Sequence, residues 1–258
     1  MGVTLEAFDV SKSYRGKNAL SGFSLSVEQG KIHGLLGPNG SGKTTCLHIL
    51  TGLLSSDTGT VTINGEIIES KESRSLLGFA PDDLPLPGAI TGREYLDFHD
   101  AMRRRSDRKR ADVLLDALGI GADLEKHVAE YSHGMRRKIQ VVTATMHQPH
   151  LLVLDEPFRG LDPDAAVVLR NLIVSFARSG RSVLIATHDM LRAQRDCDEV
   201  TILSSGSTVA SGSPDSLIGN DPQASTLEDV FLGVTGLPRD NEIRREAIET
   251  LFERSAHV

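Results

Sequence analysis

A run of nine residues, Gly37 to Thr45, constrains the fold of this chain of 258 residues more than any other feature. The run reads Gly-Pro-Asn-Gly-Ser-Gly-Lys-Thr-Thr and fits the pattern G-x-x-x-x-G-K-[ST]. It follows a mostly apolar segment, Lys31–Leu36, and opens a helical pattern that begins near Gly42 and ends near Gly52. Strand, glycine-rich loop and helix in this order predict a phosphate-binding loop in an α/β fold.

The residue types in this loop suit a bound nucleoside triphosphate. Glycines let the backbone curl until successive N–H groups face one centre, and the following helix adds the positive end of its dipole. Lys43 would bring a mobile charge to the β- and γ-phosphates, and the Thr44 hydroxyl would bind Mg²⁺. A glycine-rich turn that binds nothing is the alternative. The expected binding residues are Gly37, Pro38, Asn39, Gly40, Ser41, Gly42, Lys43, Thr44 and Thr45.

A second element is the apolar run Leu151–Leu154, which ends in two carboxylates, Asp155 and Glu156. A carboxylate at the end of a buried strand is how phosphate-loop enzymes hold Mg²⁺, and this role is expected of Asp155. Glu156 could accept a proton from an attacking water. The alternative is an exposed acid pair that merely closes a strand.

A third element is Tyr131-Ser-His-Gly-Met-Arg136, which begins a helix. Ser132 is expected to cap this helix. The same hydroxyl, with the bare backbone at Gly134 and the helix dipole, would also form a second anion site. An ordinary N-cap without a ligand is the alternative.

A fourth element is His188, which follows the apolar run Val183–Ala186. Open α/β sheets bind ligands beyond the carboxyl ends of their parallel strands, so His188 is expected beside the γ-phosphate. A lone histidine is more often structural. Only the presence of the other three elements in the same chain favours a functional role for His188.

The composition argues against a nucleic-acid partner. The chain carries 28 Lys and Arg against 35 Asp and Glu, a net charge of −7, and 8 Phe, 3 Tyr and no Trp. A phosphate backbone favours a basic surface, and single strands favour aromatic stacking platforms.

Two cysteines, no secretory leader and no apolar run of about 20 residues favour a reduced, cytoplasmic protein.

Outside the motifs, hydrophobic periodicity divides the chain into an α/β core, a helical insertion at about 85–148 and a helical tail. Asn64-Gly65 and Ser205-Gly206 each predict a two-residue hairpin. The expected strands are Phe23–Val27, Lys31–Leu36, Thr60–Ile63, Glu66–Ile68, Leu76–Ala80, Leu151–Leu154, Val183–Ala186, Val200–Leu203 and Thr208–Ala210. The expected later helices are Asp164–Ala177 and Glu242–Arg254.

Together these motifs resemble the ATP-binding subunit of ABC transporters over nearly the whole chain. Ser132-His-Gly-Met resembles the family's signature, in the form common in its multidrug, bacteriocin and polysaccharide exporter branch. Gly160-Leu161-Asp162 resembles the loop that links two subunits, and His188 the switch histidine. Tyr14 lies where the family stacks an aromatic ring on adenine.

The resemblance implies a P-loop NTPase core of ABC type over residues 1–220, with an N-terminal antiparallel β subdomain, an inserted helical subdomain and a helical extension at 221–258. It implies ATP and Mg²⁺ as ligands, and ATP hydrolysis that powers a transporter. The implied partners are an integral membrane permease subunit and a second ATPase subunit, identical or paired, bound head to tail. The protein would then lie peripherally on the inner face of the membrane. ATP would contact Ser132, Gly134 and Asp162 of the opposite subunit.

One position departs from the family pattern. The family usually has Gln after a Gly-aromatic-x-Pro sequence, but here Gly78-Phe-Ala-Pro81 is followed by Asp82. Two roles are open: Asp82 joins Thr44 and Asp155 around Mg²⁺, or its charge crowds the γ-phosphate. The second is preferred, because the other two residues already supply protein oxygens to the metal.

The alternative function is a soluble ABC-type ATPase that acts on nucleic acid or ribosomes. Such relatives usually carry two ATPase cassettes, long coiled coils or zinc modules. The sequence contains none of these features.

Overall fold

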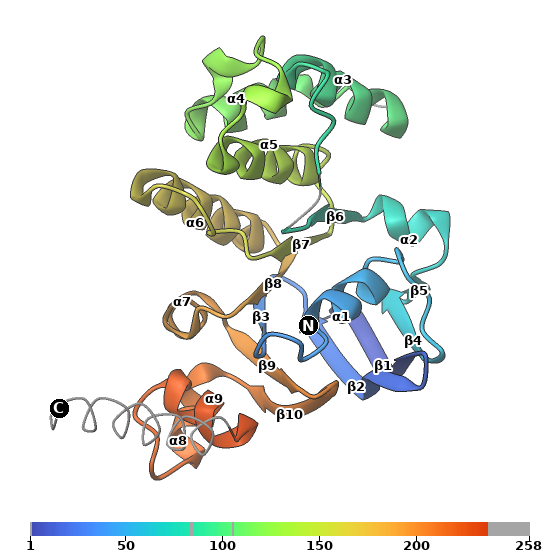
Figure 1. Ribbon diagram of the computed structural model, residues 1–258, viewed down its shortest axis with the longest axis vertical. Helices are drawn as coiled ribbons and strands as arrows, with labels where there is room; N and C mark the ends of the chain where they lie inside the picture. The colour runs from blue at the N-terminus through green and yellow to red at the C-terminus, as the bar shows by residue number, and fades with distance from the viewer. Residues whose placement is uncertain (1, 83–84, 105, 237–258) are drawn as a thin grey trace, which may run out of the picture.

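The computed structural model describes residues 2–82, 85–104 and 106–236, arranged around two β-sheets (Figure 1). The strands are β1 (Val3–Tyr14), β2 (Lys17–Glu28), β3 (Ile32–Leu36), β4 (Thr58–Ile63), β5 (Glu66–Ile67), β6 (Leu77–Ala80), β7 (Leu151–Asp155), β8 (Ser182–Thr187), β9 (Glu199–Ser204) and β10 (Ser207–Gly212). The helices are α1 (Lys43–Leu50), α2 (Lys71–Ser75), α3 (Gly92–Arg103), α4 (Arg108–Ala117), α5 (His133–Thr145), α6 (Pro163–Arg178), α7 (Met190–Asp196), α8 (Pro214–Asn220) and α9 (Leu227–Thr235), with short 3₁₀ turns η1 (Gly121–Asp123) and η2 (Val128–Glu130). The tail helix expected at Glu242–Arg254 lies outside the described residues.

The larger sheet has the strand order β10-β9-β3-β8-β7-β6. Five of its strands, β9, β3, β8, β7 and β6, run parallel to one another. Strand β10 pairs with β9 in the antiparallel direction. All residues of β3 and β8 are buried, as expected of strands covered on both faces. The expectation of a parallel α/β core is therefore confirmed.

The smaller sheet is antiparallel, with the order β2-β1-β4-β5, and it confirms the antiparallel subdomain. The expected hairpins are also confirmed. Asn64 and Gly65 have φ of 50° and 83°, and Ser205 and Gly206 have 49° and 82°, the left-handed pair that joins strands in such turns. Strand β1 was not predicted, because its register is interrupted by irregularities that break the alternation of apolar residues.

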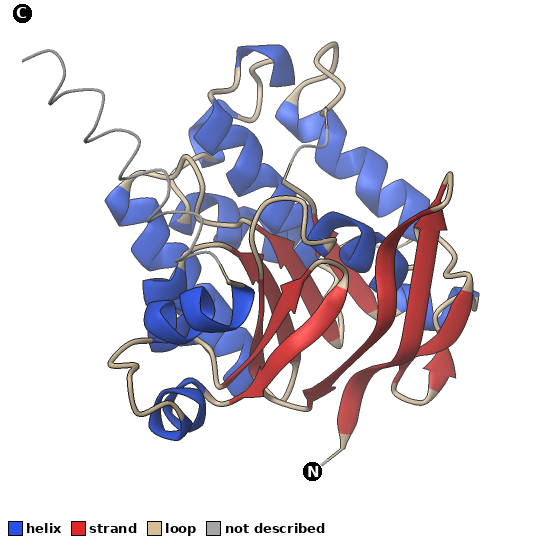
Figure 2. Cartoon of the chain, turned by 60° about the horizontal axis from the view of Figure 1, so that its bottom comes forward, coloured by secondary structure: helices blue, strands red, loops and turns tan. Residues whose placement is uncertain are grey.

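The core lies on both faces of the parallel sheet. Helix α1 lies between the two sheets, where Cys46, Leu47 and Leu50 pack with residues of both. On the opposite face, α5 and α6 cover the sheet through residues such as Val141 and Ile173. Figure 2 shows the strands of the two sheets next to one another, with most of the helices gathered to one side. This packing presents the carboxyl ends of β3, β7 and β8 at one edge.

The expected helical insertion is confirmed between β6 and β7 (Figure 1). Helices α3, α4 and α5 share a separate cluster that contains Leu96, Leu115 and Ile139. Helix α5 also contributes Val141 and Ala144 to the core under the sheet. Because α5 belongs to both clusters, a displacement of its N-terminal end would change the packing of both the insertion and the core.

Helix α9 packs against the parallel sheet. Leu227, Val230 and Phe231 of α9 are buried with Leu36 at the end of β3 and Met190 at the start of α7. Helix α9, which follows the boundary expected at residue 220, thus shares a hydrophobic cluster with β3 and α7.

The buried His33 on β3 makes the stability of the fold dependent on pH. Its side chain is 2% exposed, its Nε2 lies 2.9 Å from Thr201 Oγ1, and burial lowers its pKa from 6.5 to about 4. Between these values the unfolded chain binds the extra proton, so the free energy of unfolding should fall as pH drops below about 6.5. The expected slope from this residue is about 1.4 kcal/mol per pH unit. Chemical denaturation of wild type and His33→Gln from pH 5 to 7.5 measures it, and equal slopes would contradict it.

Candidate active site

A cleft of about 1320 Å³ opens at the carboxyl ends of the parallel strands. Its walls come from the β1–β2 hairpin, the Gly37–Thr45 loop, the ends of β6, β7 and β8, and helix α9. Residues from the sequence analysis that line it are Tyr14, Gly37, Pro38, Asn39, Gly40, Gly42, Lys43, Thr44, Thr45, Asp82, Asp155, Glu156 and His188. The fold thus brings together residues that are spread over most of the chain.

The phosphate-loop backbone is shaped by close approaches that only glycine permits. A Cβ on Gly37 would lie 2.5 Å from both Leu203 O and Ser41 Oγ, and one on Gly42 would lie 2.5 Å from Ala19 O. Gly40 and Gly42 also have φ of 79° and 106°. Helix α1 begins directly afterwards at Lys43, so its first backbone N–H groups have no acceptor within the helix.

Lys43 folds back over this loop. Its Nζ donates to Gly37 O at 2.5 Å and to Pro38 O at 3.1 Å. Burial lowers the pKa of Lys43, and the charges of Glu156 and Asp155 oppose that shift. The ammonium group therefore lies at the loop, close enough to the acid pair to be influenced by both carboxylates.

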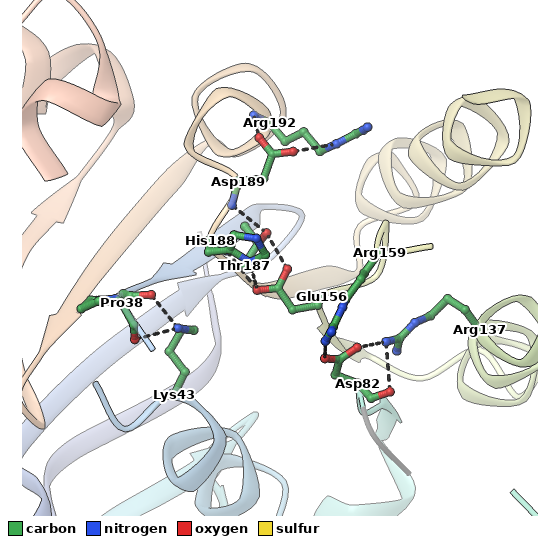
Figure 3. A network of polar contacts seen from close by, with 11 residues as sticks. Pro38, Lys43, Asp82, Arg137, Glu156, Arg159, Thr187, His188, Asp189 and Arg192 are labelled. Carbon is green, nitrogen blue, oxygen red and sulfur yellow. Dashed lines mark hydrogen bonds and ion pairs between the residues drawn. The ribbon is translucent and has the colours of Figure 1, made fainter. Parts of the chain in front are cut away.

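Glu156 is held by the end of β8 (Figure 3). Its Oε1 accepts from the His188 backbone N–H at 3.0 Å and lies 2.6 Å from His188 Nδ1, and its Oε2 accepts from Thr187 Oγ1 at 3.1 Å. Its backbone φ of 46° is the left-handed conformation, which costs free energy in a residue with a Cβ. Tertiary contacts thus fix this carboxylate in one place at the cleft.

Asp155 ends β7 in the same cleft. Burial raises the pKa of Asp155 to about 6, and the nearby Asp82 and Glu156 carboxylates add to the rise. A hydrogen bond from the Asp82 backbone and the charge of Arg137 oppose it. A nearby cation would stabilise the charged form of a carboxylate in such surroundings.

Asp82 lies at the end of β6, but its carboxylate faces two arginines. Arg137 of α5 donates to Oδ1, and Arg159, in the loop after β7, donates to Oδ2 at 2.6 Å (Figure 3). From the sequence, this carboxylate was expected at Mg²⁺ or against the γ-phosphate. Asp82 lines the cleft, and in this structure both of its carboxylate oxygens accept hydrogen bonds from cationic side chains.

The signature residues lie elsewhere. Ser132 caps α5, its Oγ accepting from Met135 N at 3.2 Å, which confirms the expected cap. Ser132, Gly134 and Asp162 are not among the described residues that line the cleft. A Cβ on Gly134 would lie 2.9 Å from Gly160 O, so the start of α5 lies against the loop that follows β7.

Several cleft residues were not predicted from the sequence as members of the site. They are Lys17, Asn18, Ala19, His48, Pro81, Arg159, Met190, Ser205, Gly206, Glu228, Phe231 and Leu232. Arg159 could have been noticed, since it follows the acid pair by three positions. The run Thr226–Leu232 resembles the exporter branch of the family, but no role at the site was expected of it, because only the packing of α9 against Leu36 and Met190 brings its residues to the cleft.

A nucleotide fits this cleft on structural grounds. The Gly37–Thr45 loop lines the cleft, and Ser41 Oγ, which packs close to Gly37, is buried with no hydrogen-bond partner among the described residues. Lys43 and the start of α1 supply positive charge at this loop. These features suit the phosphates of a nucleotide.

Comparison with known proteins identifies the family. The model of the ABC transporter family matches residues 20–159. The chain belongs to this family. It is the ATP-binding and ATP-hydrolysing subunit of a transporter, and the predicted family and fold are confirmed.

Individual relatives are similar over most of their length. The Nod factor export ATP-binding protein I of Burkholderia orbicola (strain AU 1054) is 35% identical, over 85% of this subunit and 74% of that protein. The linearmycin resistance ATP-binding protein LnrL of Bacillus subtilis (strain 168) is 29% identical, over 98% and 85%. A solved ATP binding subunit of an ABC transporter is 28% identical with a TM-score of 0.85, over 90% and 99%.

A nucleotide-free ATP-binding cassette, 23% identical with a TM-score of 0.73, shares the fold.

In the part of the subunit that the structure describes, no helix combines the length and the apolar character needed to cross a membrane.

Proposed function

We propose that this subunit powers a membrane exporter through ATP-driven, head-to-tail pairing of two ATPase subunits. The observation that carries the proposal is the Glu156 carboxylate, fixed by Thr187 and His188 at the cleft that also holds Lys43. A carboxylate so placed can accept a proton from a water molecule that attacks the γ-phosphate. Little covalent chemistry is then required of the protein, because positioning and charge stabilisation dominate phosphoryl transfer.

Each cleft residue has a proposed role. Lys43 leaves the carbonyl groups of Gly37 and Pro38 to neutralise the β- and γ-phosphates. Thr44 and Asp155 would hold Mg²⁺, which would supply charge neutralisation at the phosphates. His188 orients Glu156 and the γ-phosphate, and Tyr14, whose side chain is 48% exposed at the cleft, stacks on adenine.

The second half of the site would come from another subunit. Ser132 and Gly134 present a helix N-terminus that lies outside the chain's own cleft, and this placement supports contact with ATP bound to the opposite subunit. Asp162 caps α6 in the loop beside them. Because ATP would contact both subunits only in the closed pair, it would have the differential affinity that drives closure.

Export and the membrane partner rest on similarity to the relatives named for Nod factor export and linearmycin resistance. We infer that the subunit binds an integral membrane permease and lies peripherally on the inner face of the membrane. The net charge of −7 disfavours the alternative, an ATPase that acts on nucleic acid or ribosomes.

The transporter proposal predicts that the subunit co-purifies from solubilised membranes with a polytopic membrane protein. ATP hydrolysis should rise when both are reconstituted in vesicles, and Lys43→Ala should abolish hydrolysis while leaving co-purification unchanged. The reason is that Lys43 lies in the cleft and the partner would bind another surface. Co-purification with ribosomes or nucleic acid and no membrane protein would favour the alternative.

A further inference from the structure

The carboxylate of Asp82 joins two segments that are distant in the sequence (Figure 3). Arg137 approaches one oxygen from α5, and Arg159 approaches the other at 2.6 Å from the loop after β7. The side chain of Asp82 is 14% exposed, that of Arg137 is 1% exposed and that of Arg159 is 57% exposed. The three residues form a charged cluster, partly buried, at the edge of the cleft; we call it the Asp82 clamp.

The buried member of the clamp depends on its counter-charge. Arg137 also donates to Pro81 O at 2.7 Å and to Asp82 O at 3.2 Å, so three hydrogen bonds tie it to the end of β6. A buried guanidinium group without a nearby anion would be strongly destabilising. Asp82 supplies a negative charge at hydrogen-bond distance from Arg137, which a neutral glutamine would not, and the charges of Arg137 and Asp155 also interact.

The two arginines lie beside the parts that complete the proposed composite site. Arg137 follows Gly134 by three positions on α5, and Arg159 lies between Glu156 and the Gly160–Asp162 loop. The same two segments also meet where a Cβ on Gly134 would lie 2.9 Å from Gly160 O. The clamp thus joins three things: the end of β6, the start of α5 and the loop after the acid pair.

We propose that Asp82 is a positioning residue that clamps the start of α5 to the loop after β7, and that it is not a Mg²⁺ ligand. This inference rests on the proposed pairing of two subunits, because the clamped start of α5 is the surface that would meet the opposite ATP. Two guanidinium groups on its oxygens disfavour a divalent cation at the same carboxylate. Asp82 then sets how well the two subunits close, while Mg²⁺ affinity depends on other groups.

The test uses the full chain carrying Glu156→Gln, in which an ATP-bound pair is expected to accumulate. Asp82→Asn and Arg159→Gln are added separately, and Arg170→Gln is the matched control. That control breaks an ion pair of similar length, 2.6 Å from Arg170 Nε to Asp196 Oδ1, between α6 and α7. Two quantities are measured: the ATP concentration that half-saturates dimer formation, and the Mg²⁺ concentration that half-saturates binding of a fluorescent ATP analogue to dilute monomer.

The clamp predicts that Asp82→Asn and Arg159→Gln each raise the ATP requirement for dimer formation by at least about fivefold, a typical size for coupling between sites. The Mg²⁺ requirement of the monomer should change by less than about twofold, and Arg170→Gln should change neither quantity. A raised Mg²⁺ requirement in Asp82→Asn would instead make Asp82 a metal ligand. Unchanged dimer formation in Arg159→Gln would overturn the clamp even if Asp82→Asn failed to fold, because Arg159 is its exposed member.

Failure of the clamp and failure of the paired-subunit proposal give different results. If Glu156→Gln alone forms no ATP-dependent dimer, the proposed function fails before the clamp is tested, and the inference falls with it. If the parent dimer forms and both added variants dimerise equally well, only the clamp fails. Thermal denaturation of each variant separates a general loss of stability from a specific loss of closure.

Discussion

Glu156→Gln is expected to reduce ATP turnover by about 10²–10⁴-fold while leaving ATP binding intact. The amide cannot accept a proton from the attacking water, but it has the same shape and keeps an oxygen to accept from the His188 backbone N–H, which lies 3.0 Å from Oε1. The ATP-bound dimer of two subunits should therefore persist, because the hydrolysis step that would release it is blocked. Steady-state hydrolysis and size-exclusion chromatography with ATP measure the two effects.

Glu199→Gln is the control for this prediction, since it removes the same charge from β9 outside the residues that line the cleft. Its turnover should match wild type within about twofold. If Glu156→Gln hydrolysed ATP at a rate within tenfold of wild type, another group would have to accept the proton. The position of Glu156 beside His188 would then be structural.

Gly134→Asp is expected to abolish hydrolysis while sparing the affinity of the monomer for ATP. In the proposed pair the new carboxylate would face the γ-phosphate of the opposite site, and two like charges about 4 Å apart repel by about 4 kcal/mol at an effective dielectric of 20. Hydrolysis assays and an equilibrium nucleotide titration at low protein concentration measure both outcomes.

Gly134→Ala separates charge from crowding. A Cβ at this position lies 2.9 Å from Gly160 O, so both variants disturb the loop, and only the aspartate adds a charge. Alanine should lower turnover far less than aspartate. If Gly134→Asp lowered the affinity of the monomer for ATP as strongly as it lowered hydrolysis, this segment would act within its own chain. That result would contradict head-to-tail pairing.

Local chemistry explains why much of this subunit could be predicted from its sequence. The phosphate loop needs glycines at positions where a side chain would strike Leu203 O or Ala19 O, and those glycines are visible in the sequence. The hairpins at Asn64-Gly65 and Ser205-Gly206 need left-handed backbone, which Asn and Gly adopt at little cost and Ser at somewhat more. Strand ends, helix caps and turns are short-range features, so residue type and spacing predict them.

The surroundings of Asp82 could not be predicted in this way. Its two partners are 55 and 77 positions away, and no periodicity links an aspartate after β6 to an arginine within α5. The sequence therefore supported two roles for Asp82 that both assumed an available carboxylate. Ion pairs across distant segments depend on how the helical insertion packs on the core, so the sequence could not show that both oxygens of this carboxylate contact arginines.

The sequence by itself determined the phosphate loop, the acid pair after β7, the cap at Ser132 and the family of the subunit, because each depends on residues that are neighbours in the chain. Only the tertiary structure decided that the Glu156 carboxylate is held by Thr187 and His188, and that α9 forms a wall of the cleft. Only the tertiary structure, too, placed Asp82 between two arginines. The physical reason is that these contacts join elements far apart in the sequence, and packing alone sets their distances.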